Sequence, residues 1–304
     1  MKKNINIHDF ANEGLVNFGS IIDQKKCTKL RNQINSVRPC NKKIFFSTYP
    51  EFKRKGRFEK YSPGGSFNAL TSLNFDLDFI EKSDSFTKAV ESIMGKKFKI
   101  LKKTIIRSVP KNFMPDWISK YTEDFGRPNL NPYIKHKYQD VQYFYNADFH
   151  QDMTRGKKFA TFYIYLDNVK KKDSALKVLK KSHYFGASFY PHYIRKSTDK
   201  QSYFYSDLKG NHLKCEEFTC TGKTGNLLAF HGLSLHGSYY NFSKDPRISL
   251  RYLICPNSKS KNTIFRKSFL KIKNYPIKIN NKFARLDRDL KSGTFKKTGM
   301  TITY

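Results

Sequence analysis

The chain has 304 residues, enough for one large domain or two small ones with a buried core. Aromatic residues make up 15% of it, which excludes the composition of a disordered chain. Its 58 Lys and Arg residues outnumber its 25 Asp and Glu residues and give a formal net charge of +33. That charge attracts nucleic acid, anionic lipid or small acids, but compositional bias produces the same lysine excess. Composition alone does not choose between these explanations.

The cysteines follow neither a disulfide framework nor a zinc-site spacing; they are Cys27, Cys40, Cys215, Cys220 and Cys255. The first residues contain no apolar signal-peptide segment, and no apolar run has the length of a membrane span. We therefore expect free thiols and a cytoplasmic protein.

The N-terminal part begins with an extended segment at residues 14–18. Asp23 is the expected N-cap of a helix that ends before Pro39, and its apolar face would contain Cys27, Leu30, Ile34 and Val37. A second helix is expected over residues 85–94, followed by a strand over 98–109. Residues 110–132 form a long irregular stretch, which fits a lid or binding loop and a plain surface insertion equally well.

Strands dominate the second half of the chain. They are expected at residues 141–145, 159–166, 176–179, 216–220, 226–230, 235–240 and 247–255, separated by turn residues. Many short strands of this kind predict an antiparallel barrel or sandwich, so the fold class is mainly β with flanking helices (α+β). We expect a single domain over residues 1–304, with a helical N-terminal part to about 135, a β core over 136–255 and a basic extension over 256–304.

A His-x-Asp pair lies in an aromatic, extended part of the sequence. His150 and Asp152 are two residues apart, so a strand would direct both side chains to the same side. One imidazole nitrogen and one carboxylate oxygen are two donors of the facial triad of non-haem Fe(II) oxygenases. The third donor would be His231 or His236. His236 is favoured because Ser238 shares its face and an alternating strand with arginines follows at residues 245–251.

Two arginines lie on the same side of the last predicted strand. Alternation places Arg247, Ser249 and Arg251 opposite Ile248 and Leu250. A buried arginine needs an anion, and its planar fork fits a carboxylate at two points. Either arginine could hold a dicarboxylate cosubstrate, or could reach solvent at a sheet edge.

These motifs together resemble the phytanoyl-CoA dioxygenase family of Fe(II)/2-oxoglutarate oxygenases. The matching residues are His150-Gln151-Asp152, residues 163–167 and 179–183, His236-Gly237-Ser238, Asn241, Ser243 and Asp245-Pro246-Arg247. The offset between His236 and Arg247 also matches the family. The resemblance covers residues 10–255 and is patchy between about 40 and 135.

The resemblance implies a double-stranded β-helix core, a jelly roll of the cupin-like kind, with N-terminal helices. It implies that His150, Asp152 and His236 bind Fe(II), and that Arg247 and Ser238 hold 2-oxoglutarate. Gln151 and Tyr163 are further expected cosubstrate contacts, with Gln142 as a weaker candidate. The reaction would consume O2 and release succinate and CO2.

The sequence departs from the family at two loops. Ser174-Ala175 replaces the usual Gly-Ala, and Lys180-Lys181 replaces Pro-Gly, which affects substrate handling more than iron binding. Asp152 is retained, which favours hydroxylation over halogenation.

We expect a small anionic metabolite as substrate. The alternatives are a basic nucleic-acid-binding protein, for which charge alone is weak evidence, and a non-catalytic barrel-fold binding module, against which the complete set of site residues argues.

Overall fold

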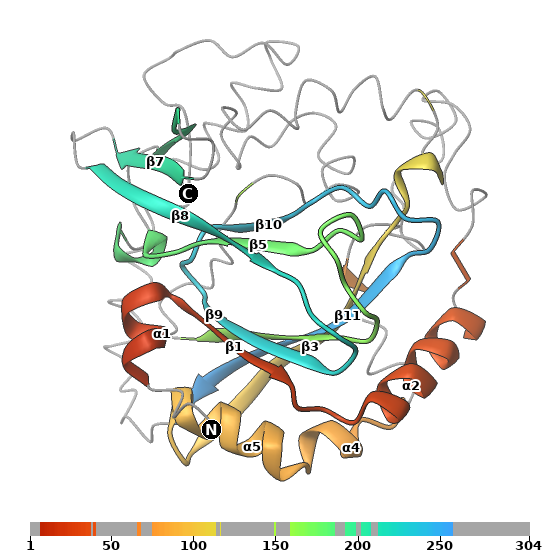
Figure 1. Ribbon diagram of the computed structural model, residues 1–304. Coiled ribbons are helices and arrows are strands. Elements are labelled where there is room, and N and C mark those ends of the chain that lie inside the picture. Colours follow the sequence, from red (N-terminus) through yellow and green to blue (C-terminus); the bar gives the residue numbers. More distant parts are fainter. Residues whose placement is uncertain are drawn as a thin grey trace, which may run out of the picture.

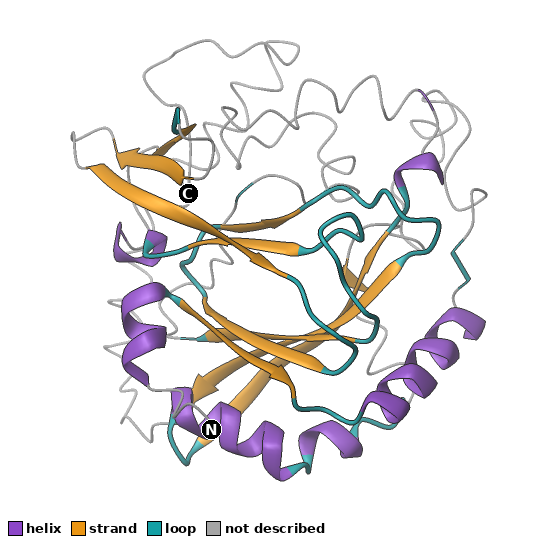
Figure 2. Ribbon diagram, viewed as in Figure 1, coloured by secondary structure: helices purple, strands orange, loops and turns teal. Residues whose placement is uncertain are grey.

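Two antiparallel sheets lie face to face, and helices cover the outer face of one of them (Figures 1 and 2). The computed structural model describes residues 7–37, 39–40, 66–67, 75–113, 116, 149, 159–185, 192–198, 202–207 and 212–257. The mainly β sandwich with flanking helices confirms the expected fold class. Among the described residues, no helix is long and apolar enough to cross a membrane.

The larger sheet has the strand order β1-β9-β4-β11-β3-β2. Its strands are β1 (Leu15–Ser20), β9 (Asn226–His231), β4 (Ala160–Tyr165), β11 (Arg247–Pro256), β3 (Phe98–Ser108) and β2 (Ser66–Phe67). The smaller sheet has the order β10-β5-β8-β7-β6. Its strands are β10 (His236–Ser238), β5 (Leu176–Leu179), β8 (His212–Cys220), β7 (Ser202–Asp207) and β6 (His192–Lys196).

The helices are α1 (Ile7–Glu13), α2 (Gln24–Val37), α4 (Asp78–Glu81) and α5 (Asp84–Met94), with short 3-10 helices at Lys111–Phe113 and Ser182–Phe185. Asp23 caps α2 as expected, because its carboxylate accepts a hydrogen bond of 2.9 Å from the amide of Lys26. Val37 is 50% exposed, so the expectation that it belongs to the buried face is wrong. The buried face of α2 therefore ends at Ile34, one turn before the end of the helix.

Two apolar cores follow from the alternation of side chains along the strands. One lies between the helices and the larger sheet and includes Ile34, Phe86 and Leu250. The other lies between the two sheets and includes Tyr163, Val178 and Phe230. The second core forms the interior of the sandwich, and the candidate site lies there.

Part of the sequence prediction falls outside the described residues, namely the strand at 141–145 and most of the segment 110–132. The strands expected near 98–109, 159–166, 176–179, 226–230 and 247–255 are confirmed within a few residues. Helix α1 and strands β6 and β7 were not predicted. All five cysteines are free, and burial raises the pKa of the Cys27 thiol to about 12.

Candidate metal and cosubstrate site

His236 and Ser238 face the interior between the two sheets. Strand β10 pairs with β5 in a register that matches His236 with Val178 and Ser238 with Leu176. Paired residues of antiparallel strands direct their side chains to the same face, and both partners belong to the inter-sheet core. His236 is 4% exposed, so the imidazole is enclosed.

The His236 ring is oriented through one of its nitrogens. Its Nδ1 lies 3.0 Å from the carbonyl oxygen of Ser234, and the ring lies 4.5 Å from that of Phe230. Because a carbonyl only accepts, Nδ1 donates in this contact, and Nε2 is the ring nitrogen that would bind a metal. Metal-binding histidines commonly donate their other ring N–H to a backbone carbonyl in this way. The orientation therefore suits a metal ligand.

His231 faces away from this interior. It follows Phe230, which belongs to the inter-sheet core, so alternation along β9 directs His231 to the opposite side. Its ring lies 5.2 Å from that of His183 and 6.1 Å from that of Phe10. Its Nδ1 accepts a hydrogen bond of 3.2 Å from the amide of Leu233. Of the two candidate histidines, only His236 lies in the inter-sheet space.

The turn at Ser182 and His183 joins several elements near β10. The Ser182 hydroxyl donates to the carbonyl of Leu179 at 2.6 Å and accepts from the amide of Leu235 at 2.8 Å. His183 Nε2 lies 2.8 Å from the carbonyl of Ala11, and a Cβ on Gly14 would collide with the His183 ring. This close packing fixes the chain just before His236.

Burial lowers the pKa of His183, and two neighbours oppose that shift. The carbonyl of Ala11 and the carboxylate of Glu13 both act to raise the pKa, but burial has the larger effect. The His183 imidazole is therefore favoured in its neutral form in the folded protein.

Arg247 is a buried cation at the start of β11, only 3% exposed. Its Nη1 donates to the hydroxyl of Tyr163 at 2.9 Å and to that of Ser249 at 2.7 Å. Its Nε is buried and has no hydrogen-bond partner in the described part of the chain. A buried donor without a partner is costly, so the guanidinium has capacity for an acceptor that a bound carboxylate would supply.

Arg247 remains charged despite its burial. Burial acts to lower its pKa, whereas the phenols of Tyr163 and Tyr165 and the carboxylate of Asp167 raise it, and the net direction is upward. Arg251, the alternative on the same strand, is half-buried and its Nε donates to Thr104 at 3.3 Å. Of the two predicted candidates, Arg247 is the buried one, and it lies beside the rings of Tyr163 and Tyr165.

Four of the predicted site residues, Gln142, His150, Gln151 and Asp152, lie outside the described residues. In the described ranges no group of three or more His, Cys, Asp or Glu side chains is placed to hold a metal ion. The described site residues are His236, Ser238, Arg247 and Tyr163, and all four are buried.

Phe149, the residue directly before His150 in the sequence, is described. It packs in a cluster with Leu179 and Leu235, and its ring lies 5.1 Å from that of Tyr203. Lys177 Nζ lies 4.6 Å from the centre of the Phe149 ring. Lys177 pairs with Gly237, so Phe149 lies on the outer face of β5 and β10, behind the strand that carries His236.

Sequence reasoning missed two contacts of the site residues. Tyr165 flanks Arg247, and the Ser234 carbonyl orients His236. Ser249 was placed on the side of Arg247, but its hydrogen bond to the guanidinium was not predicted. Alternation in β4 would have placed Tyr165 on the same face as Tyr163, since the two are two residues apart. The Ser234 contact uses a backbone carbonyl, for which a sequence holds no signal.

Comparison with known proteins identifies the family. The family model described as phytanoyl-CoA dioxygenase (PhyH) matches residues 10–249. No curated protein sequence matches the chain.

Among solved structures, the non-heme alpha ketoglutarate dependent carbocyclase SnoK from nogalamycin biosynthesis is 12% identical, covers 84% of each chain and has a TM-score of 0.49. AviO1 from Streptomyces viridochromogenes Tue57 is 11% identical, with 83% of this chain and 94% of that chain covered and a TM-score of 0.48. The epimerase SnoN, in complex with Fe3+, alpha ketoglutarate and nogalamycin RO, is 10% identical over 82% of each chain with a TM-score of 0.47.

The family model covers most of the chain, and the mainly β fold agrees with it. The chain belongs to the phytanoyl-CoA dioxygenase family, whose members are oxygenases that depend on Fe(II), 2-oxoglutarate and O2.

Proposed function

We propose that this oxygenase hydroxylates a C–H bond of a small anionic metabolite and converts 2-oxoglutarate to succinate and CO2. The observation that carries the proposal is the pairing of two buried groups in one interior. The His236 ring is enclosed and is oriented through the contact of its Nδ1 with the Ser234 carbonyl, and Arg247 is a buried cation whose Nε has no partner among the described residues.

We propose His150, Asp152 and His236 as the three Fe(II) ligands. His236 is favoured over His231 because only His236 faces the inter-sheet space. Phe149, the residue before His150 in the sequence, packs on the outer face of the strands next to β10. His150 and Asp152 are proposed from the sequence motif.

We propose that Arg247 and Ser238 hold the distal carboxylate of 2-oxoglutarate. The guanidinium is fixed by Tyr163 and Ser249, which leaves the Nε side of its fork for two-point binding. Tyr163 would contact the cosubstrate from β4, and Gln151 and Gln142 are proposed as further contacts. Burial keeps water from competing for these donors.

The bound iron supplies the activation of O2 and the oxidative attack on the substrate. The protein supplies orientation: the Ser234 carbonyl sets the His236 ring, and the charge of Arg247 fixes the direction in which the cosubstrate lies. Retention of Asp152 favours transfer of a hydroxyl group over transfer of a halide.

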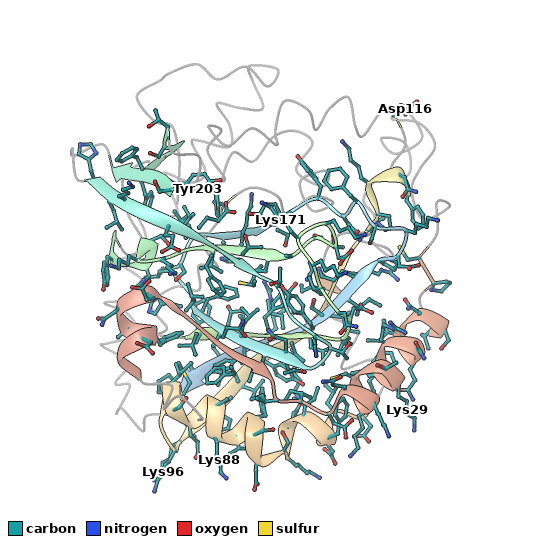
Figure 3. The ribbon with its side chains drawn as sticks, viewed as in Figure 1. Lys29, Lys88, Lys96, Asp116, Lys171 and Tyr203 are labelled. Carbon is teal, nitrogen blue, oxygen red and sulfur yellow. The ribbon has the colours of Figure 1, made fainter. Side chains whose placement is uncertain are left out.

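The net charge supports an anionic substrate only in part. Lys29, Lys88 and Lys96 are exposed and project away from the helical layer, far from the inter-sheet interior (Figure 3). Exposed lysines of this kind add to the net positive charge of the protein without contributing to a binding site between the sheets. The proposal of a small acid as substrate therefore depends on charge nearer to the site, and a screen of anionic metabolites tests it.

We also propose that residues 1–304 form a single domain. Strands β1 and β3, from the N-terminal part, pair with β9 and β11 of the β core. One cooperative unfolding transition is expected, and two separable transitions would contradict it. The cytoplasmic location remains a prediction.

The test is an anaerobic titration of the apoprotein with Fe(II) and then 2-oxoglutarate, followed by visible absorption. We expect a weak metal-to-ligand charge-transfer band that saturates with 2-oxoglutarate. Anionic metabolites are then screened for stimulated succinate release, with the product examined by mass spectrometry for one added oxygen atom. Bound iron without the band would contradict the cosubstrate assignment, and a product without added oxygen would contradict hydroxylation.

A further inference from the structure

Tyr165 connects the two sheets through its hydroxyl group. The residue lies on β4 of the larger sheet, is fully buried and belongs to the inter-sheet core. Its hydroxyl donates to the carbonyl of Cys220 at 2.7 Å and accepts from the amide of Leu176 at 3.1 Å. Leu176 and Cys220 are paired across β5 and β8 in the smaller sheet. The phenol therefore spans the interior from one sheet to the other.

The same ring lies beside the guanidinium of Arg247. The Arg247 Cζ lies 5.8 Å from the centre of the Tyr165 ring and 5.7 Å from that of Tyr163. The two rings are 5.9 Å apart and nearly perpendicular, at 81°. Two backbone hydrogen bonds fix the end of the Tyr165 side chain, so this ring cannot turn aside as a free phenylalanine ring would.

The strand register gives the level of Tyr165 along the interior. Ser238, Leu176 and Cys220 form one row across the smaller sheet, and the Tyr165 hydroxyl bonds to that row. His236 lies in the neighbouring row, two residues away, which corresponds to about 7 Å along a strand. An acid that starts at the level of His236 and ends on Arg247 therefore extends toward Tyr165.

We propose that Tyr165 is a specificity-determining residue that sets the length of the cosubstrate, admitting a five-carbon 2-oxodicarboxylate and excluding its six-carbon homologue. This inference rests on the proposed function. Tyr165 acts as a fixed wall beside the arginine, whose guanidinium is oriented by Tyr163 and Ser249. A longer chain would have to displace a side chain that is hydrogen-bonded to two strands of the smaller sheet, β5 and β8.

The experiment measures equilibrium binding of 2-oxoglutarate and 2-oxoadipate to the anaerobic Fe(II) protein, by the charge-transfer band. The variants are Tyr165→Leu, which removes the wall, and Tyr165→Phe, which keeps the ring but removes both hydrogen bonds. One methylene group in a closed site changes selectivity by about tenfold or more. We expect the wild type to bind 2-oxoglutarate more tightly than 2-oxoadipate by about that factor. In Tyr165→Leu the ratio of the two dissociation constants should fall by about tenfold.

Tyr252→Phe is the matched control. Tyr252 is also fully buried on the larger sheet, but it faces the helices, and its hydroxyl donates to Glu81 at 3.3 Å. It should lose stability without a change in the ratio of the two dissociation constants. If Tyr165→Leu does not fold, Tyr165→Phe decides the matter, because its ratio should shift toward 2-oxoadipate and that of Tyr252→Phe should not.

The outcomes separate this inference from the proposed function. No band with 2-oxoglutarate in the wild type would overturn the proposed function itself. A normal band with unchanged selectivity in the folded Tyr165 variants would overturn only the role of Tyr165.

Discussion

Replacing Arg247 with lysine keeps the positive charge but removes the planar fork. The guanidinium donates to Tyr163 and Ser249 through Nη1. Its Nε has no partner among the described residues and can therefore donate to a ligand. A lysine ammonium cannot bind a carboxylate at two points with this geometry. Loss of one charge-assisted hydrogen bond costs about 2 kcal/mol. At about 1.4 kcal/mol per factor of ten, 2-oxoglutarate should bind about 30-fold more weakly.

The assay is the anaerobic 2-oxoglutarate titration at fixed Fe(II), which reports binding without turnover. Arg251→Lys is the control, because Arg251 lies on the same strand and the same face and bonds Thr104. Its dissociation constant should stay near that of the wild type, and iron stoichiometry should be unchanged in both variants. Equal weakening in both variants, or weakening in Arg251→Lys alone, would refute the assignment of the clamp to Arg247.

Three further predictions concern the metal, the core and the response to pH. His236→Ala should lose stoichiometric iron in a metal-binding assay and His231→Ala should keep it; the reverse result would show that the distal ligand is misassigned. Phe86→Ala should lower the free energy of unfolding by about 3–5 kcal/mol in urea, since Phe86 is 1% exposed, whereas Val37→Ala should change it by under about 0.5 kcal/mol. Because burial lowers the pKa of His183 in the folded state, its contribution to stability is present above the unfolded value of about 6.5 and is lost as pH falls through the lower folded value. His183→Gln should therefore show a smaller loss of stability between about pH 7.5 and pH 5 than the wild type, and an equal loss would contradict this reading.

The alternation of side chains made much of the β core predictable. In β11, Ile248 and Leu250 pack toward the helices while Arg247 faces the inter-sheet interior. The sequence pattern indicated that they lie on opposite sides of the strand. The residues favoured His236 over His231 but did not settle the choice, because it depends on which face of β9 and β10 is enclosed. The sequence alternates in both segments, and only the packing of the sheets distinguishes inside from outside.

Other features depend on contacts that the sequence does not encode locally. The hydroxyl of Tyr165 bonds backbone atoms of two other strands, and backbone atoms are the same at every residue. Helix α1 is only seven residues long, too short for a clear apolar period. Val37 continues the helical spacing of α2, yet it lies beyond the surface that covers the helix. The Fe(II) ligands His150 and Asp152 remain predictions from the motif.

The first strand of the larger sheet depends on the part of the chain that is made much later. Ser20 bonds the carbonyl of Thr224 across 204 residues, and Ser234 bonds the carbonyl of Gly14 across 220. During synthesis, β1 must therefore wait without its partner until β9 has left the ribosome, which at about 5–20 residues per second takes on the order of ten seconds or more. Contacts of such high sequence separation also slow folding after release. The unpaired β1 segment is thus a part of the nascent chain that stays open to misassembly for most of synthesis.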